Sequence, residues 1–359
     1  MKIAILAPCL EHGRDGIGDY SHGLAKGTRE NGHSVFLVGL SDRFVSTPTK
    51  QPSMIRLPAA APWRLKAQWL KAELEAFSPD VVSLQFVCYG FHPKGFCWPV
   101  ADYLRQALGK TPVHLMLHEL WLGAERSATL KDRLIGWVQR RCVLNLFSKL
   151  NIHKVYTSNA AYRAVLSRNR VDAEILPLFG AIPVRPNLRR KQTNDAWRFV
   201  MFGALHPVWP PVELLAYLLG LGRQVRIEHV GQIRGGATLW WKMVRDYGAQ
   251  NDFHLWGEQP PEVIAQIFAD ADFGIATTPW ELIGKSASVA AMLEHGLPVI
   301  VNRDEVHFDE WGQEGYDPQL IKMGPDLPAR LVAAQRREAH SRLPDVTKRI
   351  LEAMEQARM

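Results

Sequence analysis

The sequence has little cysteine and no long uncharged apolar run, and both absences narrow the class of protein. A membrane-spanning helix needs roughly 18 consecutive apolar residues, and no stretch of the 359 residues provides them. The chain begins MKIAILAPCLEHGRDG, which lacks a small-residue cleavage site, so we expect a buried first strand rather than a signal peptide. The four cysteines lie far apart and without zinc spacing, which predicts buried free thiols in a reducing cytoplasm: Cys9, Cys88, Cys97 and Cys142.

Two nucleotide-binding motifs are incomplete. Gly284-Lys285-Ser286 spells the end of a P-loop, but Pro279 stands where that motif requires a glycine. A dinucleotide fingerprint beginning at Gly16 would need a further glycine where Ser21 stands. These gaps argue against a P-loop protein and against a dinucleotide oxidoreductase.

Length and charge suggest two domains of different character. Hydrophobic residues make up 47% of the chain and charged residues 22%, as in ordinary soluble proteins, and the length favours two domains. Residues 1–180 carry 23 lysines and arginines against 14 acidic residues, whereas residues 181–359 carry 20 against 22. The basic half is expected to face a phospholipid surface, a phosphorylated acceptor or nucleic acid, unless it is simply a solvated face. It lacks an interleaved aromatic platform, which argues against nucleic acid.

The first half predicts alternating strands and helices, as in a parallel sheet covered on both faces. Lys2–Ala7 is predicted as a buried strand, and the glycines of Glu11–Tyr20 follow it, where backbone can approach a phosphate or sugar. A helix is expected from Tyr20 to Asn31, and residues 41–62 predict an irregular connection. The helix expected over 62–77 mixes Trp with Lys and Arg, so it lies on a membrane interface or, as we favour, on the sheet. Further strands are expected over Asp80–Phe86, Val113–Leu117, Val155–Ser158 and Glu174–Leu178, with a long basic helical stretch over 124–149.

Polar side chains follow two of these strands at their carboxyl ends, where open α/β sheets bind ligands. Tyr89, His92 and Lys94 follow the strand that ends at Phe86. The next strand is followed by His118, Glu119 and Trp121. A lone histidine is usually structural, but this position makes a ligand-binding role for His118 equally reasonable. Glu119 could orient an acceptor or cap a helix.

Residues 273–301 are the most informative segment of the second half. A strand over Phe273–Thr277 leads through a loop to a helix that Ser286 or Ser288 can cap and that Gly296 stops. Unpaired amides at the helix start, the helix dipole and Lys285 favour an anionic ligand such as a diphosphate.

Together these loops resemble the GT-B glycosyltransferases, specifically the large group 1 retaining family, over essentially the whole chain. The resemblance implies an α/β protein with two Rossmann-like domains facing a central cleft. We expect an acceptor domain over 1–184, a linker over 185–197, a nucleotide-sugar donor domain over 198–340, and a C-terminal helix within 341–359 that crosses back to the first domain. The motifs that carry the resemblance are Gly16-Ile17-Gly18-Asp19-Tyr20, His118, Gly257-Glu258-Gln259, Pro279, Gly284 and Gly296-Leu297-Pro298-Val299.

The family's activity implies that a hexosyl unit moves from a UDP-, GDP- or ADP-sugar to a saccharide or lipid-linked acceptor with retention. In this reading His118 positions the donor sugar, Glu281 holds the ribose hydroxyls and Lys285 binds the diphosphate. The other expected donor-binding residues are Gly16, Gly18, Asp19, Gly203, His206, Arg234, Gly257, Glu258, Gln259, Gly284, Ser286, Ala287 and Ser288. The expected acceptor-binding residues are Tyr20, Tyr89, His92, Lys94, Glu119 and Trp121.

The chain departs from the family pattern in two places. The family has a second glutamate where counting from Glu281 reaches Val289, and it has an Arg and a Lys after the glycine that corresponds to Gly203. We hypothesise that Lys285 and Arg234 replace the missing charge. We assign no Asp-x-Asp motif to metal binding, and we expect neither a required metal nor a tightly bound cofactor.

The departures leave a second interpretation open, a catalytically weak sugar-nucleotide-binding partner subunit of a glycan-assembly system. Either protein is expected in the cytoplasm. Peripheral association with an anionic inner membrane face through the basic first domain is also expected.

Overall fold

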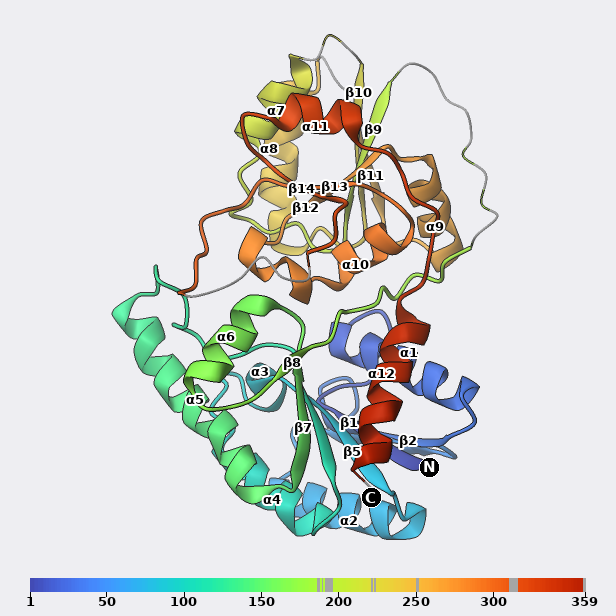
Figure 1. Ribbon diagram of the computed structural model, residues 1–359, viewed down its shortest axis with the longest axis vertical. Coiled ribbons are helices and arrows are strands. Elements are labelled where there is room, and N and C mark those ends of the chain that lie inside the picture. Colours follow the sequence, from blue (N-terminus) through green and yellow to red (C-terminus); the bar gives the residue numbers. More distant parts are fainter. Residues whose placement is uncertain are drawn as a thin grey trace. The chain divides into compact units, whose positions relative to one another are not determined.

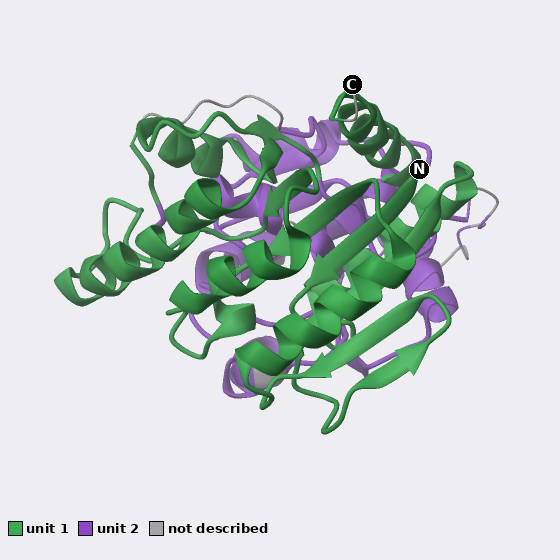
Figure 2. Cartoon of the chain, turned by 90° about the horizontal axis from the view of Figure 1, so that it is seen from below, with its two compact units in different colours: residues 1–177, 307–312, 343–359 green, residues 178–306, 313–342 purple. Residues whose placement is uncertain are grey.

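The computed structural model describes residues 1–185, 188, 190, 196–220, 222, 224–249, 252–309 and 316–357, apart from the side chains of Leu219 and Arg234. The chain forms two compact units, which Figure 2 colours separately. Unit 1 comprises residues 1–177, 307–312 and 343–359, and unit 2 comprises residues 178–306 and 313–342. Most of the linker expected over 185–197 lies outside the described residues.

Unit 1 is built on one mainly parallel sheet (Figure 1). Its strands are β1 (Lys2–Ala7), β2 (Ser34–Asp42), β3 (Thr49–Gln51), β4 (Met54–Pro58), β5 (Val81–Phe86), β6 (Val113–Leu117), β7 (Ile152–Thr157) and β8 (Glu174–Ile175). Its helices are α1 (Gly16–Glu30), α2 (Trp63–Phe77), α3 (Cys88–Phe91), α4 (Trp98–Leu108), α5 (Leu130–Lys149), α6 (Ala160–Arg168) and α12 (Leu343–Gln356). The strand order is β3-β4-β2-β1-β5-β6-β7-β8, and each neighbouring pair is parallel except β3 with β4.

Side-chain caps set where the helices of unit 1 begin. The carboxylate of Asp15 accepts the N–H groups of Ile17 and Gly18, both at 3.1 Å, so α1 begins at Gly16 and not at Tyr20 as predicted. The hydroxyl of Thr129 caps α5 in the same way. This helix therefore begins at Leu130, later than the basic stretch predicted over 124–149. The last helix, α12, packs against α1 within unit 1.

Two connections in unit 1 are more regular than the sequence predicted. The segment 41–62 holds the antiparallel pair β3 and β4, because Ile55 and Leu57 alternate with partly exposed neighbours and are themselves buried. The loop after β5 forms the short helix α3. The three elements β3, β4 and α3 have only three to five residues each, which is too short for sequence periodicity to identify them reliably.

Unit 2 contains a fully parallel sheet whose two faces are covered by different helices (Figure 1). Its strands are β9 (Trp197–Phe202), β10 (Val225–Val230), β11 (Asp252–Gly257), β12 (Phe273–Ala276), β13 (Val299–Val301) and β14 (Leu320–Lys322), in the order β11-β10-β9-β12-β13-β14. Its helices are α7 (Val212–Leu219), η1 (Arg234–Gly236), α8 (Ala237–Tyr247), α9 (Pro261–Asp270), η2 (Trp280–Lys285), α10 (Ala287–Glu294) and α11 (Leu327–Ala333). Helices α7, α8 and α11 pack on the face that presents Phe199 and Met201, whereas α9 packs on the opposite face, where Phe268 meets Phe202.

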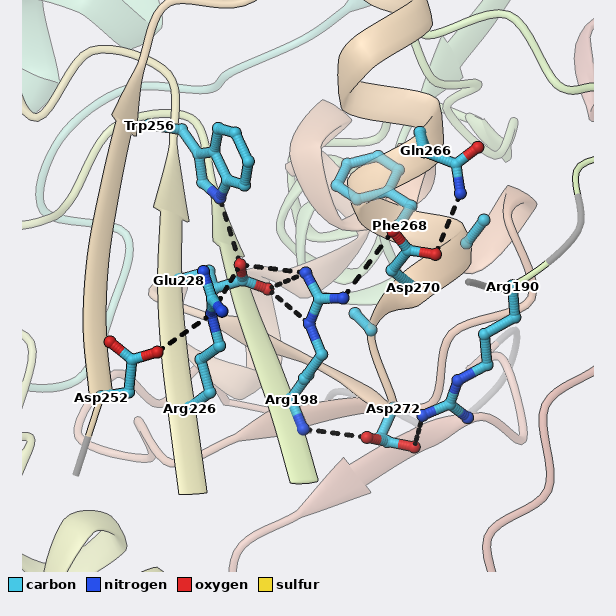
Figure 3. A network of polar contacts seen from close by, with 12 residues as sticks. Arg190, Arg198, Arg226, Glu228, Asp252, Trp256, Gln266, Phe268, Asp270 and Asp272 are labelled. Atoms are coloured by element: carbon cyan, nitrogen blue, oxygen red, sulfur yellow. Dashed lines mark hydrogen bonds and ion pairs between the residues drawn. The ribbon is translucent and has the colours of Figure 1, made fainter. Parts of the chain in front are cut away.

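A buried ion network links β9 and β10 to α9 (Figure 3). The guanidinium of Arg198 donates to the carboxylate of Glu228 at 2.9–3.1 Å and lies 3.7 Å from Asp270. The indole N–H of Trp256 donates to Glu228 at 3.2 Å, so the fully buried carboxylate has several donors. A buried carboxylate needs such compensation, because an unpaired charge in the interior costs several kcal/mol.

All four cysteines are free and buried, as the sequence predicted. Within the described residues, no helix is both long and apolar enough to cross a membrane.

The buried carboxylate of Glu294 joins two distant segments of unit 2. It accepts the N–H of Gly180 at 2.8 Å and the N–H of Arg342 at 2.7 Å. These segments lie next to two of the four points where the chain passes from one unit to the other, at 177–178 and 342–343. Burial raises the pKa of Glu294 from 4.5 to about 7, although the two N–H donors and the Arg342 charge act in the opposite direction.

We predict that Glu294→Ala lowers the free energy of unfolding by about 2–4 kcal/mol, because two buried amides lose their acceptor. Since the folded protein favours protonated Glu294, the stability that this residue contributes is complete below pH 4.5 and is lost as the pH rises towards 7. The deficit of the variant is therefore expected to be smaller at pH 8 than at pH 5 in urea titrations. Glu352→Ala, at a side chain that is 59% exposed, is the matched control and should change stability little. Equal stability of Glu294→Ala and the wild type at pH 5 would contradict this role.

Candidate functional site

Three neighbouring strands of unit 2 lead to glycines with left-handed backbones at one edge of the sheet. These are Gly203 after β9 (φ 87°), Gly231 after β10 (φ 108°) and Gly257 at the end of β11 (φ 66°). The N–H of Gly203 donates to Val230 at 2.9 Å, and the N–H of Gly231 donates to Gly257 at 2.8 Å. A Cβ added at Gly231 would lie 3.2 Å from the backbone of Gly203, which is tighter than ordinary van der Waals contact. The carboxyl edge of the sheet therefore presents bare backbone, where open α/β sheets bind ligands.

The start of α10 lies against this glycine edge. A Cβ added at Gly203 would be 3.5 Å from the Cβ of Ser288. Ser286 caps the helix by accepting the N–H of Val289 at 3.3 Å, and its hydroxyl lies 3.1 Å from that of Ser288. The amides of Ala287 and Ser288 lie in the first turn of the helix and have no acceptor within it, and the helix dipole adds partial positive charge there. This geometry suits an anionic group.

Charged side chains gather beside the start of α10. Arg303, which is 5% exposed, donates to the carbonyl of Thr277 at 2.9 Å and to the carboxylate of Glu305 at 2.7 Å. Burial lowers the pKa of His206, and the charges of Arg303 and Lys285 lower it further against the opposing effect of Glu305. Three charged groups, Lys285, Arg303 and Glu305, are thus close enough to His206 to act on it electrostatically.

Sequence reasoning missed Arg303 and Gly231. Arg303 follows the end of β13, a position that the sequence could have flagged, but only the packing brings it next to Thr277 and His206. Burial raises the pKa of Glu305, but hydrogen bonds from Arg303 and its charge outweigh this and hold the pKa below its usual value. Part of the positive charge of Arg303 is therefore compensated by Glu305.

Glu281 lies in the interior of unit 2, at 3% exposure. Its neighbour Trp280 stacks on Tyr316 with ring centroids 4.8 Å apart, and the hydroxyl of Tyr316 donates to the carbonyl of Trp280 at 3.3 Å. Burial raises the pKa of Tyr316, and the negative charges of Glu281 and Asp304 raise it further, so the Glu281 carboxylate is near the phenol. The segment predicted as a loop here is the 3-10 helix η2, which also contains Gly284 and Lys285.

The remaining donor-binding candidates of unit 2 line two turns at the same edge. Glu258 accepts a hydrogen bond from Gln232 at 2.7 Å, and the amide of Gln259 donates to the carbonyl of Trp256 at 2.7 Å. Arg234 begins η1, and its side chain lies outside the described part of the chain. These bonds fix the turn after Gly257 and link it to the loop that follows β10.

His118 is a buried imidazole that is linked to a series of hydrogen bonds across β5 and β6. Its Nε2 lies 2.9 Å from Oε1 of Gln85, whose Nε2 donates to Ser83 at 2.8 Å, and Ser83 lies 3.1 Å from Nδ1 of His114. Because Gln85 offers an oxygen, Nε2 of His118 carries the proton and Nδ1 is left as an acceptor. Burial lowers the pKa of both His118 and His114 to about 3. Tyr20 packs edge-on against His118 at 4.9 Å between ring centroids.

The tip of α1 is less open than its glycines suggest. The carboxylate of Asp15 already binds the amides of Ile17 and Gly18, and a Cβ at Gly18 would lie 3.0 Å from the carbonyl of Cys9. Asp19 accepts the N–H of Gly13 at 2.9 Å, which closes the preceding loop. Gly18 and Asp19 therefore have local structural roles that are sufficient to explain them.

The predicted acceptor-binding residues differ in how they are engaged. Nδ1 of His92 accepts the N–H groups of Lys94 at 3.1 Å and Phe96 at 3.2 Å, which fixes a turn. Tyr89 is 41% exposed and Lys94 is exposed, whereas Trp121 is buried and Glu119 is partly exposed. Tyr89 and Lys94 are thus the candidates with accessible side chains.

Asp270-Ala271-Asp272 is an Asp-x-Asp sequence that the sequence analysis passed over. Its carboxylates are engaged by arginines: Asp272 pairs with Arg190 at 2.6 Å, and Asp270 lies 3.7 Å from Arg198. The motif immediately precedes β12, at the amino end of the strand, away from the glycine edge. Within the described residues, no group of three or more His, Cys, Asp or Glu side chains could hold a metal ion.

Comparison with known proteins gives a fold. No protein-family model and no curated protein sequence matches the chain. Among solved structures, Anabaena Alr3699/HepE, in complex with UDP and glucose, is 15% identical with a TM-score of 0.59, covering 99% of this chain and 100% of that chain. The catalytic domain of Arabidopsis thaliana starch synthase IV, bound to ADP and acarbose, is 9% identical with a TM-score of 0.56, covering 99% of each chain. A Listeria monocytogenes protein described as a UDP-N-acetylglucosamine 2-epimerase is 10% identical with a TM-score of 0.56, covering 99% of this chain and 96% of that chain.

The predicted fold class is confirmed: the chain has the α/β fold of the GT-B glycosyltransferases, with two units built on parallel-rich sheets. Identities this low establish fold and leave function to be argued from the site.

The two buried histidines of unit 1, His114 and His118, allow a prediction of how the stability of the protein depends on pH. Their folded-state pKa lies far below the ordinary value of 6.5, so unfolding takes up protons, and stability is lost as the pH falls from 6.5 towards 3. Each such histidine contributes a slope of about 1.4 kcal/mol per pH unit in this window. His118→Gln should reduce the slope by about that amount in urea titrations between pH 4 and 7, whereas His153→Gln, at an exposed position, should not. Identical slopes for His118→Gln and the wild type would show that His118 is not held neutral.

Proposed function

We propose that the protein transfers a hexosyl unit from a nucleoside-diphosphate sugar to a saccharide or lipid-linked acceptor with retention. One observation carries this proposal: in unit 2, the start of α10 and the cations Lys285 and Arg303 lie close to the glycine edge. The fold supports it, because proteins of the same fold include one solved with UDP and glucose and one solved with ADP and acarbose.

In this proposal the anionic leaving group is bound by unit 2. The amides of Ala287 and Ser288 and the hydroxyls of Ser286 and Ser288 contact the diphosphate, and Gly203, Gly231 and Gly257 allow it to approach the backbone. Lys285 and Arg303 supply the positive charge that stabilises the diphosphate as it departs. Arg303 thus takes the place of the missing Arg/Lys pair. Arg234 and His206 are further candidates for the same role.

His118 is proposed to position the donor sugar. Its proton is committed to Gln85, so Nδ1 can accept a hydrogen bond from a sugar hydroxyl. A group with a pKa of about 3 is neutral at physiological pH, and it therefore does not repel a sugar carbon that becomes cationic. The bond from this carbon to the diphosphate breaks as the acceptor oxygen bonds on the same face. The acceptor proton passes to an oxygen of the leaving phosphate, so this route needs no protein base.

The remaining assignments extend this proposal. Glu281 is assigned to the ribose hydroxyls, which requires it to reach the edge from its buried position beside Tyr316. Gly257, Glu258 and Gln259 border the base, and Gly284 supports the diphosphate loop. Gly16, Gly18 and Asp19 are proposed near the donor, and the acceptor is assigned to Tyr20, Tyr89, His92, Lys94, Glu119 and Trp121. The protein is proposed to be cytoplasmic and to associate peripherally with an anionic membrane through its basic N-terminal unit, with no required metal.

A catalytically weak sugar-nucleotide-binding subunit is the second candidate. Val289 stands where the family has its second glutamate, and Glu305 compensates part of the charge of Arg303. The fold also accommodates other sugar-nucleotide chemistry, since one matching structure is described as a 2-epimerase. Turnover of a donor that binds, measured as transfer or hydrolysis on the purified protein, separates an enzyme from a binding subunit.

A thermal-shift panel of UDP, GDP and ADP with their sugars tests the site, since a ligand that binds the folded state raises the melting temperature. Titrations with the best ligand should show that Lys285→Ala and Arg303→Ala each weaken binding about tenfold, because a charge-assisted contact to phosphate is lost. Lys242→Ala, an exposed cation on α8, is the matched control and should leave affinity unchanged.

Two results would overturn the proposal. One is that no nucleotide or nucleotide sugar raises the melting temperature. The other is that Lys285→Ala and Arg303→Ala, with melting temperatures like the wild type, both bind the ligand with unchanged affinity.

A further inference from the structure

Helix α5 of unit 1 exposes large apolar side chains on the face opposite its buried one. Its inner face is formed by Gly136, Gln139, Cys142, Val143 and Leu146, all buried. On the outside, Leu130 is 87% exposed, Leu134 is 68% exposed and Trp137 is 49% exposed. Figure 1 shows α5 running along the outside of unit 1. Monomeric soluble proteins rarely leave such side chains together in water without a partner.

The exposed apolar residues form a stripe with cations around it. Leu130, Leu134, Trp137 and Arg141 fall within about 60° of the helix circumference, because an α-helix turns once in about 3.6 residues. Lys131 lies on one side of this stripe, and Arg133 and Arg140 lie on the other. The guanidinium of Arg141 lies over the ring of Trp137 at 3.9 Å. We call these seven residues the α5 face.

The charge of the α5 face is strongly positive. Asp132 is the only acidic residue in the helix, and its carboxylate accepts a hydrogen bond from the hydroxyl of Thr129 at 2.6 Å. Arg133 donates to backbone carbonyls of residues 126 and 128, and Arg140 donates to the amide oxygen of Asn169, so both bind uncharged oxygens. Among the described residues, no carboxylate forms an ion pair with any of the four exposed cations of this face.

We propose that the α5 face is a docking surface for an anionic lipid bilayer, with α5 lying parallel to the membrane plane. A helix with an apolar stripe between cations binds at the boundary of headgroups and acyl chains, where its leucines and tryptophan leave water while its cations contact anionic headgroups. A second copy of the chain fits less well, because two such faces would bring like charges together. Nucleic acid fits less well too, because leucines offer neither stacking nor hydrogen bonds to bases. The inference locates the membrane association proposed above, and it does not depend on donor chemistry.

The test is flotation of the full-length protein with vesicles. Phosphatidylcholine vesicles with and without phosphatidylglycerol are compared at low and high salt. The wild type should bind the anionic vesicles, bind neutral ones weakly and lose affinity as salt increases. Trp137→Ala should weaken binding about tenfold, because its apolar surface no longer enters the bilayer. Arg141→Gln and Lys131→Gln should each weaken it about fivefold.

Trp241→Ala is the matched control, since Trp241 is 59% exposed on α8 of unit 2 and should not affect vesicle binding. Melting temperatures of all variants check that they fold, and the shift caused by UDP-glucose should be the same in the α5 variants as in the wild type. Absence of this shift in every protein would count against the proposed function while leaving the vesicle result to be judged separately.

Three outcomes would overturn the docking surface. The wild type fails to bind anionic vesicles, or the α5 variants bind them as tightly as the wild type, or the wild type is a dimer in solution that Trp137→Ala dissociates. The last outcome would assign the α5 face to a second copy of the chain.

Discussion

The left-handed backbone at Gly203, Gly231 and Gly257 is the constraint on which the candidate site depends. A side chain at any of these strand ends would strain the left-handed backbone, and at Gly231 its Cβ would also crowd the backbone of Gly203. Glycine at these positions therefore leaves the peptide bare at the carboxyl edge of the sheet of unit 2. The same geometry brings the start of α10 against β9 through Ser288. The bare backbone at the strand ends, the dipole of α10 and the nearby cations therefore all favour an anionic group in the same small region.

The charges around this region are balanced rather than simply positive. Arg303 is buried and pairs with Glu305, while His206 lies within electrostatic reach of Arg303, Glu305 and Lys285. Burial and the neighbouring cations lower the pKa of His206. In unit 1, burial lowers the pKa of His118 to about 3. In the proposed reaction, the cations of unit 2 attract the diphosphate, and a neutral His118 would not repel a developing positive charge on the sugar.

The sequence predicts most of the fold, because apolar runs of strand length alternate with helical periodicity and turn glycines. Short elements such as β3, β4 and α3 are missed, since they carry too little pattern. In the candidate site, the glycines, Ser286 and Lys285 could be predicted because they lie in one continuous motif. Arg303 could not, because only packing brings it beside Thr277. The capping role of Asp15 at α1 was also missed, because the glycines next to it suggested a ligand-binding loop.

Hydrogen–deuterium exchange of the full-length protein, with and without a saturating nucleoside diphosphate, tests the central claim most directly. Bound ligand should slow exchange of the amides at 203–206, 231–232, 257–259 and 284–289 together, because all four segments meet at the glycine edge of unit 2. Unchanged exchange in these segments at a concentration that saturates the protein, or protection confined to other parts of the chain, would contradict the assignment of this edge as the nucleotide site.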